Sequence, residues 1–171
     1  MKKIQVNEMH NSMRGYFAGH LYNAMIDNPN IWLITADLGF GLWDNIREDF
    51  PDRFINTGAS EQSAMGIAVG LALEKKIPFI YSITPFLLWR PAETIRLYLE
   101  HENIPVKLIG SGRDTDYALD GYSHNATDAY TVFKHVWPNI KTYWPNHKDE
   151  IQCTLNNIIS NDKPSFLSLK R

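Results

Sequence analysis

The chain has 171 residues, of which 44% are hydrophobic, so it has material for one domain with a sizeable core and little room for a second. Its formal net charge is −2 and it has no basic stripe, which excludes nucleic acid as an expected partner. Cys153 is the only cysteine and no apolar run reaches membrane-spanning length, which excludes an intrachain disulfide and a cysteine-rich metal site; we expect a cytoplasmic protein without membrane contact.

Helix-like and strand-like segments alternate along the whole chain. In chain order the expected elements are helix 10–27, strand 31–36, helix 41–49, strand 53–57, helix 60–74, strand 77–82, helix 90–102, strand 105–110, helix 126–135, strand 138–143, helix 147–160 and strand 164–169. The strands are short and mostly apolar, which is typical of parallel strands covered on both faces. Residues 1–171 therefore predict a single α/β domain with a doubly wound, six-stranded, mostly parallel sheet flanked by helices.

The run Gly58-Ala-Ser-Glu-Gln62 lies where a strand gives way to a helix. In an open α/β sheet this junction is at the carboxyl edge of the strands, where ligands bind. Ser60 is expected to cap the helix, and Glu61 falls in its first turn as a candidate buried acid. The helix then carries Ala or Gly at alternate positions from 64 to 72, which indicates close packing either on the sheet or on another subunit.

A long polar loop, residues 111–125, follows the fourth expected strand. Long loops in compact domains are often functional. Because this loop begins at the carboxyl end of a strand, Asp120, Ser123 and His124 are expected to face the same crevice as Glu61.

Several ordered segments resemble one known family. They are Ala36–Leu38, Arg53–Gln62, Gly66–Ala72, Phe86–Arg96 and Asp120–Asn125 with Asp128. Together they are similar to the pyrimidine-binding domain of transketolases and deoxyxylulose-phosphate synthases, over about residues 14–145. The resemblance implies the thiamine-diphosphate-binding fold, with the cofactor held between a diphosphate-binding domain and a pyrimidine-binding domain such as this one.

The resemblance also implies roles for residues near the cofactor. Glu61 matches the carboxylate that hydrogen-bonds N1′ of the aminopyrimidine and so favours the tautomer that activates the cofactor. Phe86 matches the aromatic side chain that packs on the ring, and Trp89 is a second candidate for that place. Ile83 falls on a further aromatic position of the family.

By the same resemblance, Asp120 and His124 are the candidate substrate-contacting catalytic residues. Ser111 and Arg113, at the start of the loop, are further candidate substrate-binding residues. Two family residues that grip a substrate phosphate are absent, because their positions fall on Gly112 and Trp144. Phosphate recognition needs such cations, so an unphosphorylated or nucleotide-linked sugar is expected, unless Arg113 compensates.

The chain has no Gly-Asp-Gly segment of the kind that holds the metal and diphosphate in this family. We therefore expect a split enzyme, in which a separate diphosphate-binding subunit binds Mg²⁺ (or Ca²⁺) and two copies of each chain assemble. The expected reaction is transfer of a two-carbon ketol unit between sugars. A subunit of a 2-oxo-acid dehydrogenase or decarboxylase, and a non-catalytic scaffold, remain alternatives.

Overall fold

The computed structural model describes residues 1–171 and contains a six-stranded sheet in the order β2-β1-β3-β4-β6-β5. All five strand pairings are parallel. The strands are β1 (Ile31–Thr35), β2 (Phe54–Asn56), β3 (Ile77–Ile83), β4 (Lys107–Ser111), β5 (Lys141–Tyr143) and β6 (Ser165–Leu169). The predicted doubly wound α/β fold is confirmed, and every predicted strand is present.

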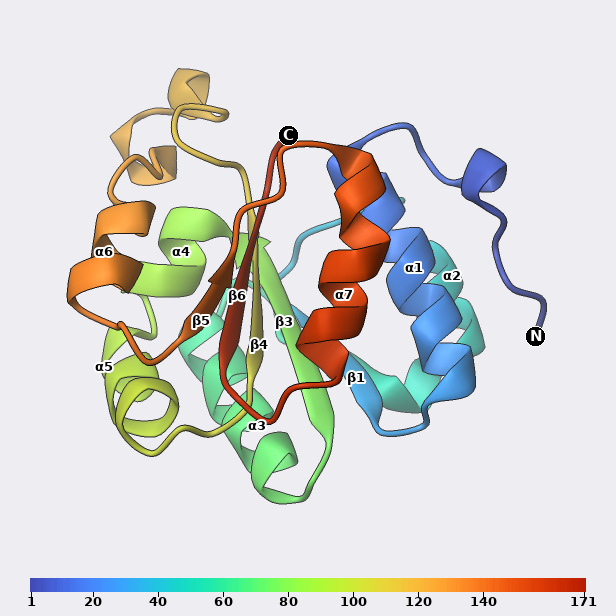
Figure 1. Ribbon diagram of the computed structural model, residues 1–171, viewed down its shortest axis with the longest axis horizontal. Helices are drawn as coiled ribbons and strands as arrows, with labels where there is room; N and C mark the ends of the chain where they lie inside the picture. The colour runs from blue at the N-terminus through green and yellow to red at the C-terminus, as the bar shows by residue number, and fades with distance from the viewer.

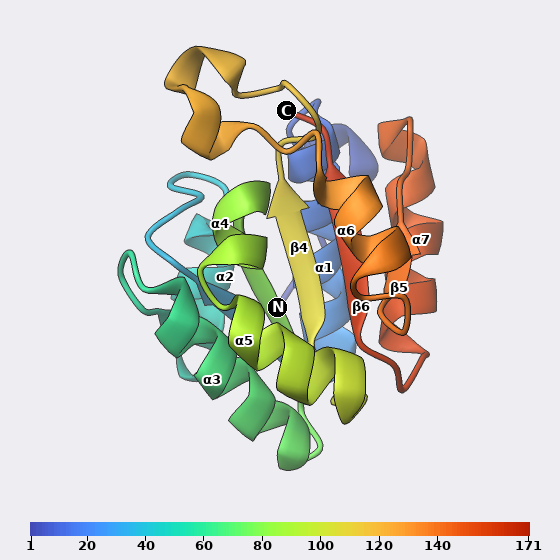
Figure 2. The same ribbon diagram turned by 90° about the vertical axis from the view of Figure 1, so that its left-hand side faces the viewer.

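Helices cover both faces of the sheet (Figure 1). They are α1 (Met13–Asp27), α2 (Asp44–Asp49), α3 (Glu61–Leu73), α4 (Thr84–Trp89), α5 (Ala92–Thr94), α6 (Ala129–His135) and α7 (Ile151–Ile159). One core lies between the sheet and α1, α2 and α7, and the other lies between the sheet and α3 to α6. In Figure 2 the helices α3 to α6 face the viewer and lie in front of the sheet. Neighbouring strand residues alternate between the two cores, as Phe79 and Ile80 do, because successive side chains of a strand point to opposite faces.

The connection after β3 differs from the sequence prediction. The sequence predicts a helix only from residue 90, but α4 begins at Thr84, directly after β3, with Pro85 in its first turn. Proline is tolerated there because the first amide groups of a helix have no intrahelical acceptor. Pro91 then interrupts the helix, which continues through α5 into a π-helix, Ile95–His101.

Helix α3 uses its two faces differently. Ala64, Ala68 and Ala72 are buried on the sheet side. Gly66 and Gly70 face outward, and a Cβ added at either would meet no atom within 4 Å. The alanines therefore explain the packing on the sheet, whereas the glycines leave an open helix face on the surface of the chain.

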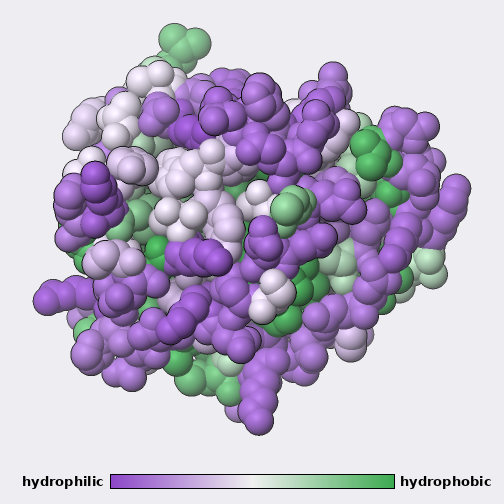
Figure 3. All heavy atoms as spheres, in the orientation of Figure 1, coloured by the Kyte–Doolittle hydropathy of each residue, from purple (hydrophilic) through white to green (hydrophobic).

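The face of the molecule seen in Figure 1 is largely polar. Figure 3 shows hydrophilic side chains over most of the face seen in Figure 1, with small, separate apolar areas. None of the helices is long and apolar enough to cross a membrane.

Candidate functional site

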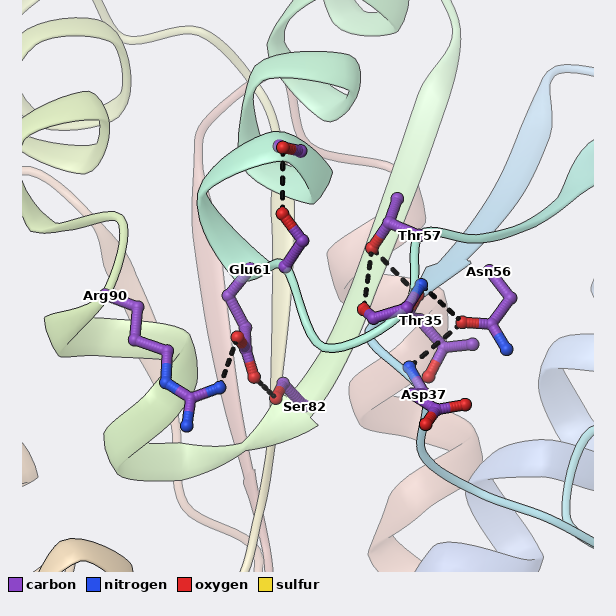
Figure 4. A network of polar contacts seen from close by, with 10 residues as sticks. Thr35, Asp37, Asn56, Thr57, Glu61, Ser82 and Arg90 are labelled. Carbon is purple, nitrogen blue, oxygen red and sulfur yellow. Dashed lines mark hydrogen bonds and ion pairs between the residues drawn. The ribbon is translucent and has the colours of Figure 1, made fainter.

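The chain around Glu61 is shaped by Asn56, the last residue of β2. Its side-chain oxygen accepts hydrogen bonds from the backbone N–H of Asp37 and of Gly58, both at 3.0 Å (Figure 4). Asp37 and Gly58 have φ values of 57° and 68°, in the left-handed region that Asp and Gly adopt most readily. Asn56 thus fixes two turns side by side at the carboxyl edge of the sheet.

Glu61 is the first residue of α3 and is buried, with 2% of its surface exposed. The expected cap by Ser60 is wrong. Ser60 lies at the cap position, but its hydroxyl donates to the Ser63 hydroxyl at 2.9 Å, and it accepts no backbone hydrogen bond from the helix. The helix begins without that cap, and the side chain of Glu61 is fixed by other groups.

Two donors hold the Glu61 carboxylate (Figure 4). The Ser82 hydroxyl, at the end of β3, donates to Oε1 at 3.0 Å, and the Arg90 guanidinium donates to Oε2 at 2.6 Å. Burial of a carboxylate is costly unless its oxygens are hydrogen-bonded, and charge-assisted bonds of this kind are the strongest available. The carboxylate is therefore held in one orientation, without contact with bulk water.

Phe86 and His124 extend this cluster. The Arg90 Cζ lies 3.9 Å from the centroid of the Phe86 ring, and the His124 ring packs edge-on against Phe86 with centroids 4.8 Å apart. The structure thus brings three of the predicted site residues, Glu61, Phe86 and His124, into one continuous set of contacts through Arg90. Sequence reasoning gave Arg90 no role, because its motif position does not reveal where its side chain points.

A cavity of about 570 Å³ lies at the same edge of the sheet. Three predicted residues, Ile83, Ser111 and Asp120, line it. Ile83 follows Ser82, the residue bonded to Glu61, so the cavity and the Glu61 cluster lie on opposite sides of the end of β3. The end of β3 therefore lies between the carboxylate cluster and the cavity, which has predicted substrate residues in its wall.

The cavity wall includes polar residues that the sequence reasoning missed. Arg14 donates to the Tyr117 hydroxyl at 3.0 Å, and that hydroxyl is hydrogen-bonded to the Ser111 hydroxyl at 2.9 Å. The Arg14 Nε is buried without a partner, and burial raises the pKa of the neighbouring Tyr81. Arg14 and Tyr117 are 103 residues apart, so no local sequence signal connects them.

Gly112 is one of the two positions at which an expected phosphate-binding residue is absent. Its φ is +82°, and a Cβ at this position would lie 2.3 Å from the Tyr117 ring. Tyr117 thus fills the space that a side chain at position 112 would need. Trp144, the other departure, is partly buried; its ring packs on Phe166 of the core beneath α3 to α6 and against the exposed Tyr130.

Two predicted site residues lie outside both the cavity and the carboxylate cluster. The Trp89 ring is half exposed and lies beside Trp137, with centroids 6.4 Å apart. The buried Arg113 side chain turns toward β6 and donates to the Ser168 hydroxyl and to the carbonyls of Ser168 and Pro145. Neither side chain therefore lines the cavity or contacts the Glu61 carboxylate. No group of three or more His, Cys, Asp or Glu side chains is placed to hold a metal ion.

Comparison with known protein families identifies the family of this chain. Residues 10–171 match the model of the transketolase pyrimidine-binding domain. The chain belongs to this family. Membership implies thiamine diphosphate as the cofactor, and it agrees with the six-stranded parallel sheet and with the position of Glu61 at the carboxyl edge.

Relatives of this transketolase domain include subunits of several enzymes. The chain is 30% identical over 122 residues to one subunit of the apulose-4-phosphate transketolase of Actinobacillus succinogenes, covering 71% of this chain and 39% of that protein. It is 27% identical over 124 residues to the 6-deoxy-6-sulfo-D-fructose transketolase subunit SqwH of a Clostridium species, covering 72% and 38%.

A solved structure is also similar. A split gene transketolase, described as an inactive beta4 tetramer, is 26% identical, has a TM-score of 0.82, and is matched over 94% of this chain and 51% of that one. The chain thus spans about half or less of the length of the relatives it matches.

Proposed function

We propose that this chain is the pyrimidine-binding subunit of a split, thiamine-diphosphate-dependent transketolase that transfers a two-carbon ketol unit between sugars. The observation that carries the proposal is the buried Glu61 carboxylate, held by Ser82 and Arg90 beside the Phe86 ring, in a domain of the transketolase family. Glutamate is almost never fully buried unless it is paired, and the ion-pair partner of Glu61 is the half-exposed Arg90, so this carboxylate at the sheet edge is a candidate functional group.

The residues at this edge suit the pyrimidine half of the cofactor. When bound, thiamine diphosphate supplies a nucleophilic thiazolium carbon. Glu61 would accept a hydrogen bond from the ring nitrogen and hold the proton shared at that position. Phe86 would pack on the face of the ring, and Ile83 offers an apolar wall nearby. Burial of Glu61 keeps water from competing for the same hydrogen bond.

We assign the neighbouring cavity to the sugar. Asp120 and Ser111 in its wall, and His124 beside Phe86, are proposed to contact the hydroxyl groups of the substrate and of its adduct. Arg14 and Tyr117 add a cation and a hydroxyl to the same wall. Because Tyr117 fills the space at Gly112, we propose a substrate other than a standard pentose phosphate, such as an unphosphorylated or nucleotide-linked sugar.

We propose that a separate subunit holds the diphosphate and Mg²⁺ (or Ca²⁺), and that two copies of each chain assemble in the cytoplasm. The transketolase subunits among the relatives support a split enzyme, and the tetramer of the split-gene relative supports association of such chains. The open face of α3 around Gly66 and Gly70 has the small side chains that close contact between helices requires.

Reconstitution tests this proposal. The chain is mixed with a candidate diphosphate-binding subunit, thiamine diphosphate and Mg²⁺, and ketol transfer is measured with a panel of sugar donors and acceptors. We expect activity from the mixture and none from either chain alone. Release of carbon dioxide from a 2-oxo acid without ketol transfer, or full saturation at low concentration by simple pentose phosphates, would contradict the assignment of reaction or substrate respectively.

A further inference from the structure

Arg90 makes two contacts with groups of the proposed cofactor site. Its guanidinium donates to the Glu61 Oε2 at 2.6 Å, and its Cζ lies 3.9 Å from the centroid of the Phe86 ring. The side chain is 45% exposed, whereas that of Glu61 is 2% exposed, so Arg90 covers the carboxylate from the solvent side. The hydrogen bond to Glu61 is the only one that the Arg90 side chain makes.

These two contacts resemble those expected of an aminopyrimidine ring. A guanidinium is flat, donates N–H bonds in its plane and packs face-on against aromatic rings. A ring that accepts stacking on Phe86 and donates to Glu61 would use the same carboxylate oxygens and the same aromatic surface. At 3.9 Å the Arg90 guanidinium is already in van der Waals contact with Phe86, so no second flat group fits between them.

We infer that Arg90 occupies the place of the aminopyrimidine in the separate chain and withdraws into solvent when the ring enters. This inference rests on the proposed function, since it takes the ring to be that of thiamine diphosphate. Arg90 is a positioning residue in this scheme. Before the ring arrives it compensates the buried charge of Glu61 and keeps the carboxylate aimed at the site.

Withdrawal of Arg90 is compatible with its surroundings. It lies at the carboxyl end of α4, directly before Pro91, where the regular helix is interrupted. Nearly half of its side chain is already in solvent, so a change of side-chain rotamers suffices and no backbone movement is required. Ring binding must then displace the contacts of Arg90 with Glu61 and Phe86, which weakens the apparent affinity of the chain for the ring.

The test uses the pyrimidine half of the cofactor, 4-amino-5-hydroxymethyl-2-methylpyrimidine, titrated into the full chain at neutral pH and followed by NMR. The ring nitrogen takes up one proton from solvent on binding, because an unprotonated ring nitrogen and an ionised carboxylate are both acceptors. Arg90→Met removes the competing group, and Arg96→Met is the matched control because Arg96 is an exposed arginine further along the same helical segment. We expect about tenfold tighter binding to Arg90→Met, equivalent to about 1.4 kcal/mol, and unchanged binding to Arg96→Met.

A second measurement does not depend on a variant. In the wild-type chain, the Arg90 side-chain Nε–Hε signal should shift on saturation with the pyrimidine to the position typical of solvated arginine. Equal or weaker binding to Arg90→Met, no binding to any chain, or an unchanged Arg90 signal at saturation would overturn the inference.

One further variant separates this inference from the proposed function. Glu61→Gln in the Arg90→Met background should abolish the gain in affinity, because the carboxylate is the group that receives the ring. If binding of the pyrimidine to the wild-type chain depends on Glu61 but Arg90→Met binds it no more tightly, Arg90 does not occupy the place of the ring, and the proposed function stands. If binding is indifferent to Glu61 in both backgrounds, the proposed function fails as well.

Discussion

Replacement of Arg113 tests whether this residue supports the fold or the substrate. Its side chain is 8% exposed and donates from Nε to the Ser168 hydroxyl at 3.0 Å, and from one terminal nitrogen to the carbonyls of Pro145 and Ser168 at 2.8 and 2.7 Å. These bonds join the loop after β4 to β6 and to the segment after β5. Arg113→Met would leave two buried carbonyl groups without this donor.

The size of the effect follows from these contacts. A hydrogen bond to a charged group contributes about 1.5–3 kcal/mol, but the three bonds share the cost of burying one guanidinium, so we expect a total loss of about 3 kcal/mol rather than their sum. Burial desolvates the Arg113 guanidinium and thereby lowers its pKa. The loss would be a large part of the stability of a domain of this size.

Urea unfolding followed by tryptophan fluorescence measures this loss, and Trp144 is a suitable reporter because its ring lies 5.6 Å from the Arg113 Cζ. Arg47→Met is the control, since Arg47 forms only an exposed ion pair with Asp44, and it should change stability by less than about 0.5 kcal/mol. A loss of unfolding free energy below about 1 kcal/mol for Arg113→Met, together with weaker substrate binding by the assembled enzyme, would refute this reasoning. That result would indicate that Arg113 binds substrate, as the sequence predicts.

Two other substitutions test the packing of the site and of the sheet. Gly112→Ala should destabilise the chain by about 2 kcal/mol in a urea titration, because a side chain at φ +82° is strained and would displace Tyr117; unchanged stability would contradict the account of that turn. Burial lowers the pKa of Lys107 from 10.5 to about 8, although its ammonium group donates to the Asn161 and Lys163 carbonyls. Between pH 8 and 10.5, Lys107 is protonated in the unfolded chain and mostly deprotonated in the folded one. The free energy of unfolding of the wild-type chain should therefore rise with pH across this range, by up to about 3 kcal/mol relative to that of Lys107→Met. A difference that stays constant from pH 8 to 10.5 would contradict the shift.

Much of the fold was predictable because the four central strands, β1, β3, β4 and β6, are largely buried on both faces. The run Ile31–Thr35, for example, is short and largely apolar, and a loop separates it from the next helix. The same periodicity is wrong after β3, where it predicts a helix only from residue 90. Pro85 instead occupies the first turn of α4, and Pro91 separates two helical pieces.

The candidate site was predictable only in part. Glu61 was recognisable because a strand-to-helix junction fixes the position of the first helical residue at the sheet edge. The hydrogen-bond partners of its carboxylate, Ser82 and Arg90, could not be predicted, because they depend on the directions in which side chains leave β3 and α4. Tyr117 and Arg113 illustrate the same limit: both belong to one loop, yet one reaches Arg14 in the cavity and the other turns to β6.

The most direct test of the central claim is the rate at which the C2 proton of thiamine diphosphate exchanges with deuterium, measured by NMR in the complex of this chain with its diphosphate-binding subunit and Mg²⁺. The account predicts that Glu61→Gln slows this exchange by about 10²–10⁴-fold, the usual contribution of a positioned acid–base group, while the fold and the complex remain intact. Exchange at the wild-type rate in the Glu61→Gln complex would contradict the claim that this chain activates the cofactor through Glu61.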